Sequence, residues 1–240
     1  LGVRGWMNAS NPPPTAQRPA RHVYLHSLAV ATINPKSVAG YLAAFSQFVQ
    51  PDVPVWHQMG VILSATDSLN WLSKITGQQQ AALSAAAEAQ FTGPGEEIFL
   101  PYLSGERTPH NNAAARGSFA GLSHLSDPAR LAQAVMEGVT FAFRDSQRVL
   151  ADAGTRIDRL LAVGGGSKTP LWLKLIATNL DMEIALPEDG DFGGALGAAR
   201  LGLCAAEGAD PASVMTMPAI KTVISPDKNL SAACADQYAR

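Results

Sequence analysis

Three consecutive glycines, Gly164, Gly165 and Gly166, form the stretch of the sequence best suited to bind a ligand. Without side chains, their backbone can adopt positive φ angles and approach a ligand closely. A helical pattern follows, so their N–H groups would lie at the positive end of a helix dipole, which favours an anion such as a phosphate. Ser167 is a candidate N-cap, and Pro170 suits the first turn of that helix. A tight turn without a ligand uses the same glycines, so both interpretations remain open.

Two common nucleotide motifs do not fit this stretch. In a P-loop a lysine directly follows the last glycine, whereas here Ser167 separates Gly166 from Lys168. Leu161 also stands where the first glycine of a P-loop belongs. The dinucleotide fingerprint G-x-G-x-x-G fails because its third glycine position is Thr169. The sequence therefore argues against a Rossmann-type dehydrogenase.

A second candidate for chemistry is the polar loop at residues 104–117. It brings several polar side chains together, namely Glu106, Arg107, His110, Asn111 and Asn112. Loops of this kind beside buried strands often bind or close over a ligand. Glu106 and Arg107 can pair with each other, whereas no nearby partner supports His110 as a general base. A structural loop and a loop that closes an active site both remain open.

A third candidate is a polar strip of Thr66, Asp67 and Asn70 on a helix predicted over residues 57–75, which Gly77 ends. The strip is either a solvated face or the lining of a ligand cleft.

The elements that would position the glycine turn follow the order strand, turn, helix, strand and helix. Apolar runs of strand length occupy residues 160–163 and 182–186, and helical patterns cover residues 170–180 and 193–203. This alternation is typical of an α/β fold. The other predicted elements are helices over residues 39–49, 78–90, 127–153 and 226–238, and strands over residues 97–103 and 118–122.

The predicted helix at residues 127–153 has clear end signals. Asp127 is its expected N-cap, Pro128 its first residue and Gly154 its stop. We expect Glu137, inside this helix, to be an exposed or capped carboxylate.

Composition excludes several classes of protein. With 47% hydrophobic and 16% charged residues in 240, the chain can bury a core and is not disordered. The net charge of −2 gives no reason to expect a nucleic-acid partner. Two cysteines, Cys204 and Cys234, form neither a ligand cluster nor a disulfide framework, which suits the cytoplasm. Apolar runs are too short to span a membrane, so we expect no membrane partner.

Several motifs together resemble the C-terminal half of the FGGY carbohydrate kinases, in the variant closest to the xylulose kinases. They are FLPYLSGERTPHNN at residues 99–112, GSFAGLS at 117–123, AVMEGVTFAFRD at 134–145, VGGGSKTPLWLKLIATNL at 163–180 and FGGALGAARLG at 192–202. WHQMGVILSATDSLNWL at residues 56–72 fits the same group. The motifs are specific because they occur together, in order and at plausible spacing.

The resemblance implies the second domain of an actin-like (ribonuclease H-like) ATPase, as the C-terminal half of a two-domain sugar kinase. The implied reaction transfers the γ-phosphoryl group of ATP to a hydroxyl of D-xylulose, with Mg²⁺. In this family the glycine turn lies against the nucleotide, the helix with the polar strip borders the same cleft, and the loop at residues 104–112 lies between the domains without a proton-transfer role. The resemblance therefore implies nucleotide contacts from Gly164, Gly165, Gly166, Ser167, Thr66 and Asn70.

The sequence also departs from the family pattern. The resemblance covers residues 53–240, whereas residues 1–52 are not family-like and suggest a truncated or frame-shifted reading of the gene. The family's catalytic aspartate belongs to a first domain that this chain does not match, so no catalytic residue is assigned. Residues 21–53 lack the family's phosphate hairpin, and Pro170 stands where relatives often have asparagine.

From these departures we expect the isolated chain to be catalytically inactive. The expected ligands are ATP and a ketopentose sugar, and a homodimer of the parent protein is a possible assembly. Two alternatives remain: another FGGY kinase, acting on ribulose, glycerol or a similar substrate, and a non-catalytic nucleotide-binding remnant.

Overall fold

The computed structural model describes residues 62–188, 193–214 and 216–240. The predicted helix at residues 39–49, the assignment of residues 1–52 and the start of the polar-strip helix lie outside these residues. The chain divides into two compact units. One unit contains helices α8 (Gly193–Glu207) and α9 (Pro211–Val214), so α8 confirms the small-residue helix expected after the glycine turn. The other unit holds the remaining described elements.

A three-stranded sheet carries the glycine turn. Its order is β3 (Leu160–Leu161), β4 (Ile184–Pro187) and β5 (Ile220–Ile224). β3 and β4 are parallel and are joined through helix α7 (Pro170–Leu180), whereas β4 and β5 are antiparallel. Leu173 and Ala177 of α7 pack on Ile184 of β4. The predicted strand–turn–helix–strand unit is confirmed, but β5 was not predicted from the sequence.

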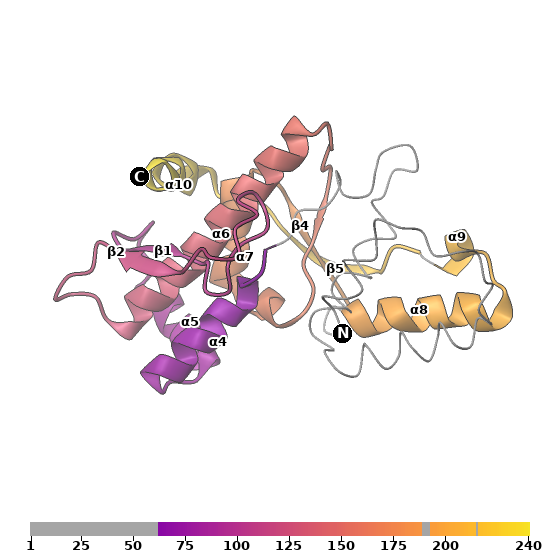
Figure 1. Cartoon of the computed structure of the whole chain (residues 1–240), viewed down its shortest axis with the longest axis horizontal. Coiled ribbons are helices and arrows are strands. Elements are labelled where there is room, and N and C mark those ends of the chain that lie inside the picture. The colour runs from indigo at the N-terminus through magenta and orange to yellow at the C-terminus, as the bar shows by residue number, and fades with distance from the viewer. Residues whose placement is uncertain (1–61, 189–192, 215) are drawn as a thin grey trace. The chain divides into compact units, whose positions relative to one another are not determined.

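The core of the same unit is built around helix α6 (Pro128–Asp152), as Figure 1 shows. Helices α4 (Ala65–Thr76), α5 (Gln80–Gln90) and α7 pack against it. The predicted end signals of α6 are confirmed, because Asp127 Oδ1 accepts a 2.8 Å hydrogen bond from the Arg130 N–H and Pro128 is the first helical residue. The shared core consists of Leu69, Leu72, Leu83, Ala87, Phe99, Ala132, Ala134, Val135, Met136, Val139, Leu171, Trp172 and Leu175.

A short antiparallel hairpin lies against α6. It consists of β1 (Ile98–Leu100) and β2 (Ser118–Ala120), which are shorter than the strands predicted at these places. Phe99 and Phe119 turn their rings inward, 4.7 Å apart, against Trp71 of α4. Gly138 of α6 allows this packing, since a methyl group at that position would lie 2.0 Å from the Phe99 carbonyl oxygen.

The last helix, α10 (Lys228–Ala239), confirms the helical tail predicted from the sequence. Asp227 caps it by accepting a 3.0 Å hydrogen bond from the Asn229 N–H. Cys234 and Gln237 turn their side chains into the interior. Helix α10 therefore belongs to the packed unit and is not a loose tail.

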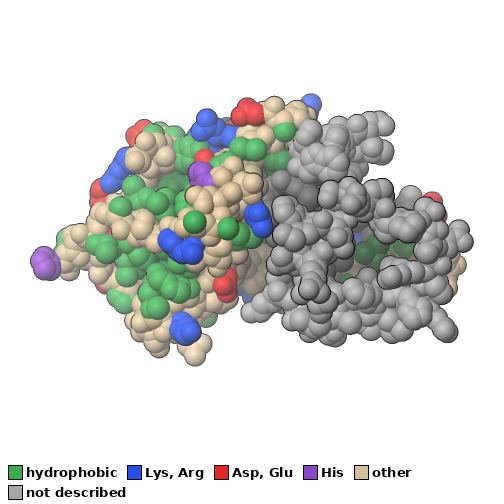
Figure 2. All heavy atoms as spheres, in the orientation of Figure 1, with side chains coloured by type: hydrophobic (Ala, Val, Ile, Leu, Met, Phe, Trp, Pro, Cys, Tyr) green, Lys and Arg blue, Asp and Glu red, His purple; other side chains and the backbone are tan. Residues whose placement is uncertain are grey.

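The surface agrees with the neutral composition. On the face seen in Figure 2, the described Lys and Arg side chains are scattered among Asp, Glu and hydrophobic ones and form no single basic patch. In the part of the chain that the structure describes, no helix is both long and apolar enough to cross a bilayer.

Candidate functional site

The glycine turn opens with a left-handed residue. Gly164 has φ 83°, a conformation that side chains rarely adopt, and the next residues form a 3-10 helix, η2 (Gly165–Lys168). Ser167 closes the turn, because its N–H and its hydroxyl both donate to the Gly164 carbonyl oxygen, at 3.2 and 2.7 Å. The sequence suggested Ser167 as the N-cap of the following helix, but Ser167 does not cap α7. The extra 3-10 turn moves the cap to Thr169, and Pro170 is the first residue of α7 as predicted.

The turn has one open side and one packed side. Among the residues that the structure describes, a methyl group at Gly164 or Gly165 would meet nothing within 4 Å. A methyl group at Gly166 would lie 3.1 Å from Thr66 Oγ1 and 3.5 Å from Trp172 Cζ3. Neighbouring side chains therefore do not fill the first two glycine positions. The backbone there is accessible to a ligand, which is what the nucleotide-site prediction requires.

Two of the predicted site segments meet at this turn, although they are about a hundred residues apart in the sequence. Thr66 lies in the first turn of α4 and places its hydroxyl beside Gly166. Asn70 lies one turn further along α4, is exposed, and donates a 3.2 Å hydrogen bond to Asp67 Oδ1. The polar strip therefore contributes Thr66 directly, whereas Asn70 is tied to a neighbour on its own helix.

The polar loop at residues 104–117 is held by its own contacts. The Arg107 guanidinium donates to Asn111 Oδ1 at 3.2 Å, so it does not form the expected ion pair with Glu106. His110 Nε2 and the Tyr102 hydroxyl share a 2.8 Å hydrogen bond, a partner that sequence reasoning missed. Tyr102 is eight residues away and its ring meets the edge of the histidine ring. These contacts connect residues within the loop and its flank.

Glu106 connects this loop to α4. Its side chain is fully buried, and Oε1 accepts hydrogen bonds from the N–H groups of Arg107 at 2.7 Å and of Leu63 at 3.2 Å. Oε2 is buried without a hydrogen-bond partner among the described residues. Burial raises the pKa of Glu106, although the two amides oppose this shift. Since Leu63 lies three residues before Thr66, the loop anchors the helix that borders the glycine turn.

Glu137 is a second buried carboxylate, and it lies in the core instead of at the surface. Of the two alternatives expected for Glu137, an exposed or a capped carboxylate, the exposed one was wrong, because only 1% of Glu137 is exposed. It accepts hydrogen bonds from Gln133 Nε2 at 2.8 Å, Gln237 Nε2 at 2.6 Å and the Gly95 N–H at 3.2 Å. Burial nevertheless raises the pKa of Glu137, and the three donors oppose the shift.

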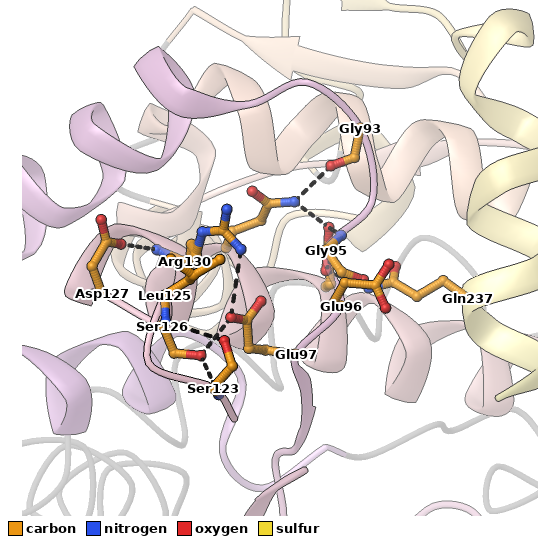
Figure 3. Close-up of polar contacts among 12 residues, drawn as sticks. Gly93, Gly95, Glu96, Glu97, Ser123, Leu125, Ser126, Asp127, Arg130 and Gln237 are labelled. Atoms are coloured by element: carbon orange, nitrogen blue, oxygen red, sulfur yellow. Dashed lines mark hydrogen bonds and ion pairs between the residues drawn. The ribbon is translucent and has the colours of Figure 1, made fainter. Parts of the chain in front are cut away.

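The residues around Glu137 are also connected by hydrogen bonds. Figure 3 shows Gln237 reaching from α10 toward Gly95, where its amide also donates to the Gly95 carbonyl oxygen at 2.9 Å. Glu97 lies nearby between Ser126 and Arg130, and the Ser126 hydroxyl donates to it at 2.6 Å. With three donors satisfying Glu137, this cluster is a structural connection between α6, α10 and residues 93–97.

A metal site is not formed by the described residues. Within residues 62–188, 193–214 and 216–240, no group of three or more His, Cys, Asp and Glu side chains is placed to hold a metal ion. A hollow of about 490 Å³ lies at the C-terminal end of α6, between Gln147 and Ile157, and the glycine turn does not line it. The chemistry available at the turn is therefore binding through the backbone N–H groups on its open side, with Thr66 supporting Gly166 from the packed side.

Comparisons with known proteins agree on one family. The model of the C-terminal domain of the FGGY family of carbohydrate kinases matches residues 27–206, more than half of the chain. A xylulose kinase of Escherichia coli (strain K12) is 43% identical over 152 residues, which are 63% of this chain and 31% of that protein. A glycerol kinase of Gloeobacter violaceus is 33% identical over 147 residues, 60% of this chain and 30% of that protein.

A solved structure extends the likeness to three dimensions. The crystal structure of a xyloylose kinase from Brucella ovis matches with a TM-score of 0.69 and 54% identity, covering 76% of this chain and 38% of that one. The chain thus spans about a third of the length of the curated relatives that it matches.

Proposed function

The chain belongs to the FGGY family of carbohydrate kinases, and we propose that it forms the nucleotide-binding side of an ATP-dependent kinase for D-xylulose. The family match and the solved relatives confirm the expected fold, the C-terminal domain of an actin-like sugar kinase. D-xylulose is proposed as the acceptor because the xylulose kinase relative has the higher identity, 43% against 33% for the glycerol kinase.

One observation carries the proposed nucleotide site: the glycine turn is open at Gly164 and Gly165 and closed behind by Thr66 at Gly166. In our proposal the nucleotide lies across the open side. Backbone N–H groups of the turn then donate to it, since glycines permit a closer approach than any other residue. Thr66 would support the turn from its packed side at Gly166, and Ser167 would keep the turn in shape through its bonds to Gly164. Asn70 is the least supported member of the proposed site.

These residues would bind and orient the nucleotide, and they supply no base. Phosphoryl transfer depends mainly on positioning and on neutralising the phosphate charge. Mg²⁺ remains an expectation from the family, and no step of the proposal depends on it because the described residues form no metal cluster. We therefore propose that these 240 residues bind ATP without turning it over, and that catalysis requires the remainder of a full-length relative. A homodimer of the full-length protein also stays a proposal.

Calorimetry with ATP on the 240-residue chain tests the nucleotide site. The informative variant is Gly165→Ala, because its methyl group would meet no atom of the described part of the chain within 4 Å and Gly165 has no left-handed φ. We expect wild-type binding, at least about tenfold weaker binding by Gly165→Ala, and unchanged thermal unfolding. Absence of ATP binding by the wild type, or full binding by Gly165→Ala, would refute the site.

An ADP-release assay tests the rest of the proposal. With D-xylulose as acceptor, the 240-residue chain should show no turnover at the rate of about 1–100 s⁻¹ that is usual for kinases. In a substrate panel, the full-length parent protein of this domain should prefer D-xylulose over ribulose and glycerol. A preference for glycerol would instead favour the alternative that the parent protein is a glycerol kinase.

A further inference from the structure

The indole ring of Trp172 supports the glycine turn from the protein side. A methyl group at Gly166 would lie 3.5 Å from Cζ3 and 3.9 Å from Cε3 of this ring. Trp172 is in the first turn of α7, is only 2% exposed, and belongs to the core that α4, α6 and α7 share. The ring of Trp172 and the hydroxyl of Thr66 therefore both lie close to the side of Gly166 where a side chain would project.

Thr140 of α6 fixes the position of that ring. The indole Nε1–H donates to Thr140 Oγ1 at 3.2 Å, and the Thr140 hydroxyl itself donates to the Met136 carbonyl oxygen at 2.7 Å. The single hydroxyl proton is therefore used on Met136, so the oxygen presents a lone pair to the indole. Thr140 is fully buried. Rotating the ring would leave a buried N–H without an acceptor, which is unfavourable.

We infer that Thr140 is a positioning residue for the nucleotide site, acting through Trp172. The inference rests on the proposed function, because it assumes that the ligand of the turn is a nucleotide. With the ring fixed, Gly166 cannot move inward, and the N–H groups on the open side are held ready for the ligand. Without the hydrogen bond the ring is free to tilt, and the nucleotide must then order the turn at the expense of affinity.

The test compares two identical substitutions, Thr140→Val and Thr178→Val. Thr178 lies on α7 and is a close match: it is 5% exposed, donates to the Lys174 carbonyl oxygen at 2.7 Å and accepts from the Asp227 N–H at 3.0 Å. Both variants lose one hydrogen bond that the hydroxyl donates to a carbonyl oxygen four residues earlier and one that it accepts from an N–H group, and both should lower the unfolding temperature. Only Thr140→Val should weaken ATP binding, by at least about fivefold. The conservative variant Thr140→Ser, which keeps the hydroxyl, should restore the affinity.

The results separate the inference from the function on which it rests. If the wild type binds ATP and Thr140→Val binds it equally well, the inference is wrong and the proposed function stands. Equal weakening by Thr178→Val would also overturn it, because the effect would then be a general loss of stability. If the wild type does not bind ATP, the proposed function itself fails.

A measurement on the wild type avoids any folding defect of the variants. In an NMR spectrum of the labelled chain, the indole N–H signal of Trp172 should shift when ATP is added. The signal of Trp71, which stacks on Phe99 with ring centroids 5.9 Å apart, should move less. A Trp172 signal that does not respond to bound ATP would contradict the inference.

Discussion

Gln237 in helix α10 donates a 2.6 Å hydrogen bond to Oε2 of Glu137, a buried carboxylate one hundred residues earlier in the chain. The same amide group donates to the Gly95 carbonyl oxygen at 2.9 Å. One side chain therefore joins α10, α6 and the segment before β1. Tyr238 adds to this connection, because its hydroxyl donates to Asp145 Oδ1 and the Arg144 guanidinium lies 4.2 Å from the centre of its ring.

We expect Gln237→Ala to reduce the free energy of unfolding by about 2 kcal/mol, because it leaves Glu137 with fewer donors in a buried place. Chemical denaturation measures the loss. The control is Gln90→Ala, which removes an exposed glutamine of α5 and should have little effect. Equal stability of the two variants would show that the connection contributes nothing.

Gly138→Ala should be among the most damaging small substitutions in the described residues. The new methyl group would lie 2.0 Å from the Phe99 carbonyl oxygen, so α6 and β1 must separate. We expect a loss of about 3 kcal/mol or more. Thermal unfolding followed by circular dichroism measures it. Gly165→Ala adds the same methyl group at a position where no described residue lies within 4 Å, and a similar loss there would contradict the steric explanation.

Glu106 should make stability depend on pH. Because burial raises the pKa of Glu106, the folded state favours the protonated carboxyl. Its stabilising contribution is therefore fully present below the ordinary glutamate pKa and is lost as the pH rises through the raised value. The stability of the wild type relative to Glu106→Gln, which does not titrate, should decrease as the pH rises above the ordinary glutamate pKa of about 4.3.

Denaturation of both proteins across this pH range measures the effect of Glu106. Glu88→Gln, which removes an exposed carboxylate from α5, controls for the change in net charge. The prediction would be contradicted if the wild type became more stable relative to Glu106→Gln as the pH rises.

The two cysteines should react at very different rates. Burial raises the pKa of the Cys234 thiol to about 11, and the charge of Glu137 adds to this shift. At pH 8 about 0.1% of Cys234 would be thiolate, and the side chain is only 2% exposed. Iodoacetamide should therefore modify the half-buried Cys204 first, as mass spectrometry of the peptides would show. Equal modification of the folded chain would disprove the burial of Cys234.

The local elements could be predicted from the sequence because their signals are local. The cap at Asp127 and the proline at Pro170 identified the starts of α6 and α7, and Gly77 ends α4 in a left-handed conformation as expected. Strand β5 was missed because it is mostly exposed and lacks a buried apolar run.

Contacts between distant segments could not be predicted in this way. Burial of Glu137 depends on Gln237, and the anchor of Glu106 is the backbone N–H of Leu63, forty-three residues earlier. No periodicity encodes such pairs. At the candidate site, the family resemblance selected Thr66 and the glycines, and the structure places Thr66 beside Gly166. The support of the glycine turn by Trp172 and Thr140 could not be predicted, because the sequence shows only one residue in each of two separate apolar helices.

The free space over Gly165 makes this position suitable for attaching a reporter group. A cysteine introduced there would point into solvent-accessible volume and could carry a fluorophore or a spin label. Since the Cys234 thiol is buried, only Cys204 would have to be replaced to make the labelling selective. Because the label would take the place proposed for the nucleotide, loss of ATP binding by the labelled chain would indicate that the ligand lies against the turn.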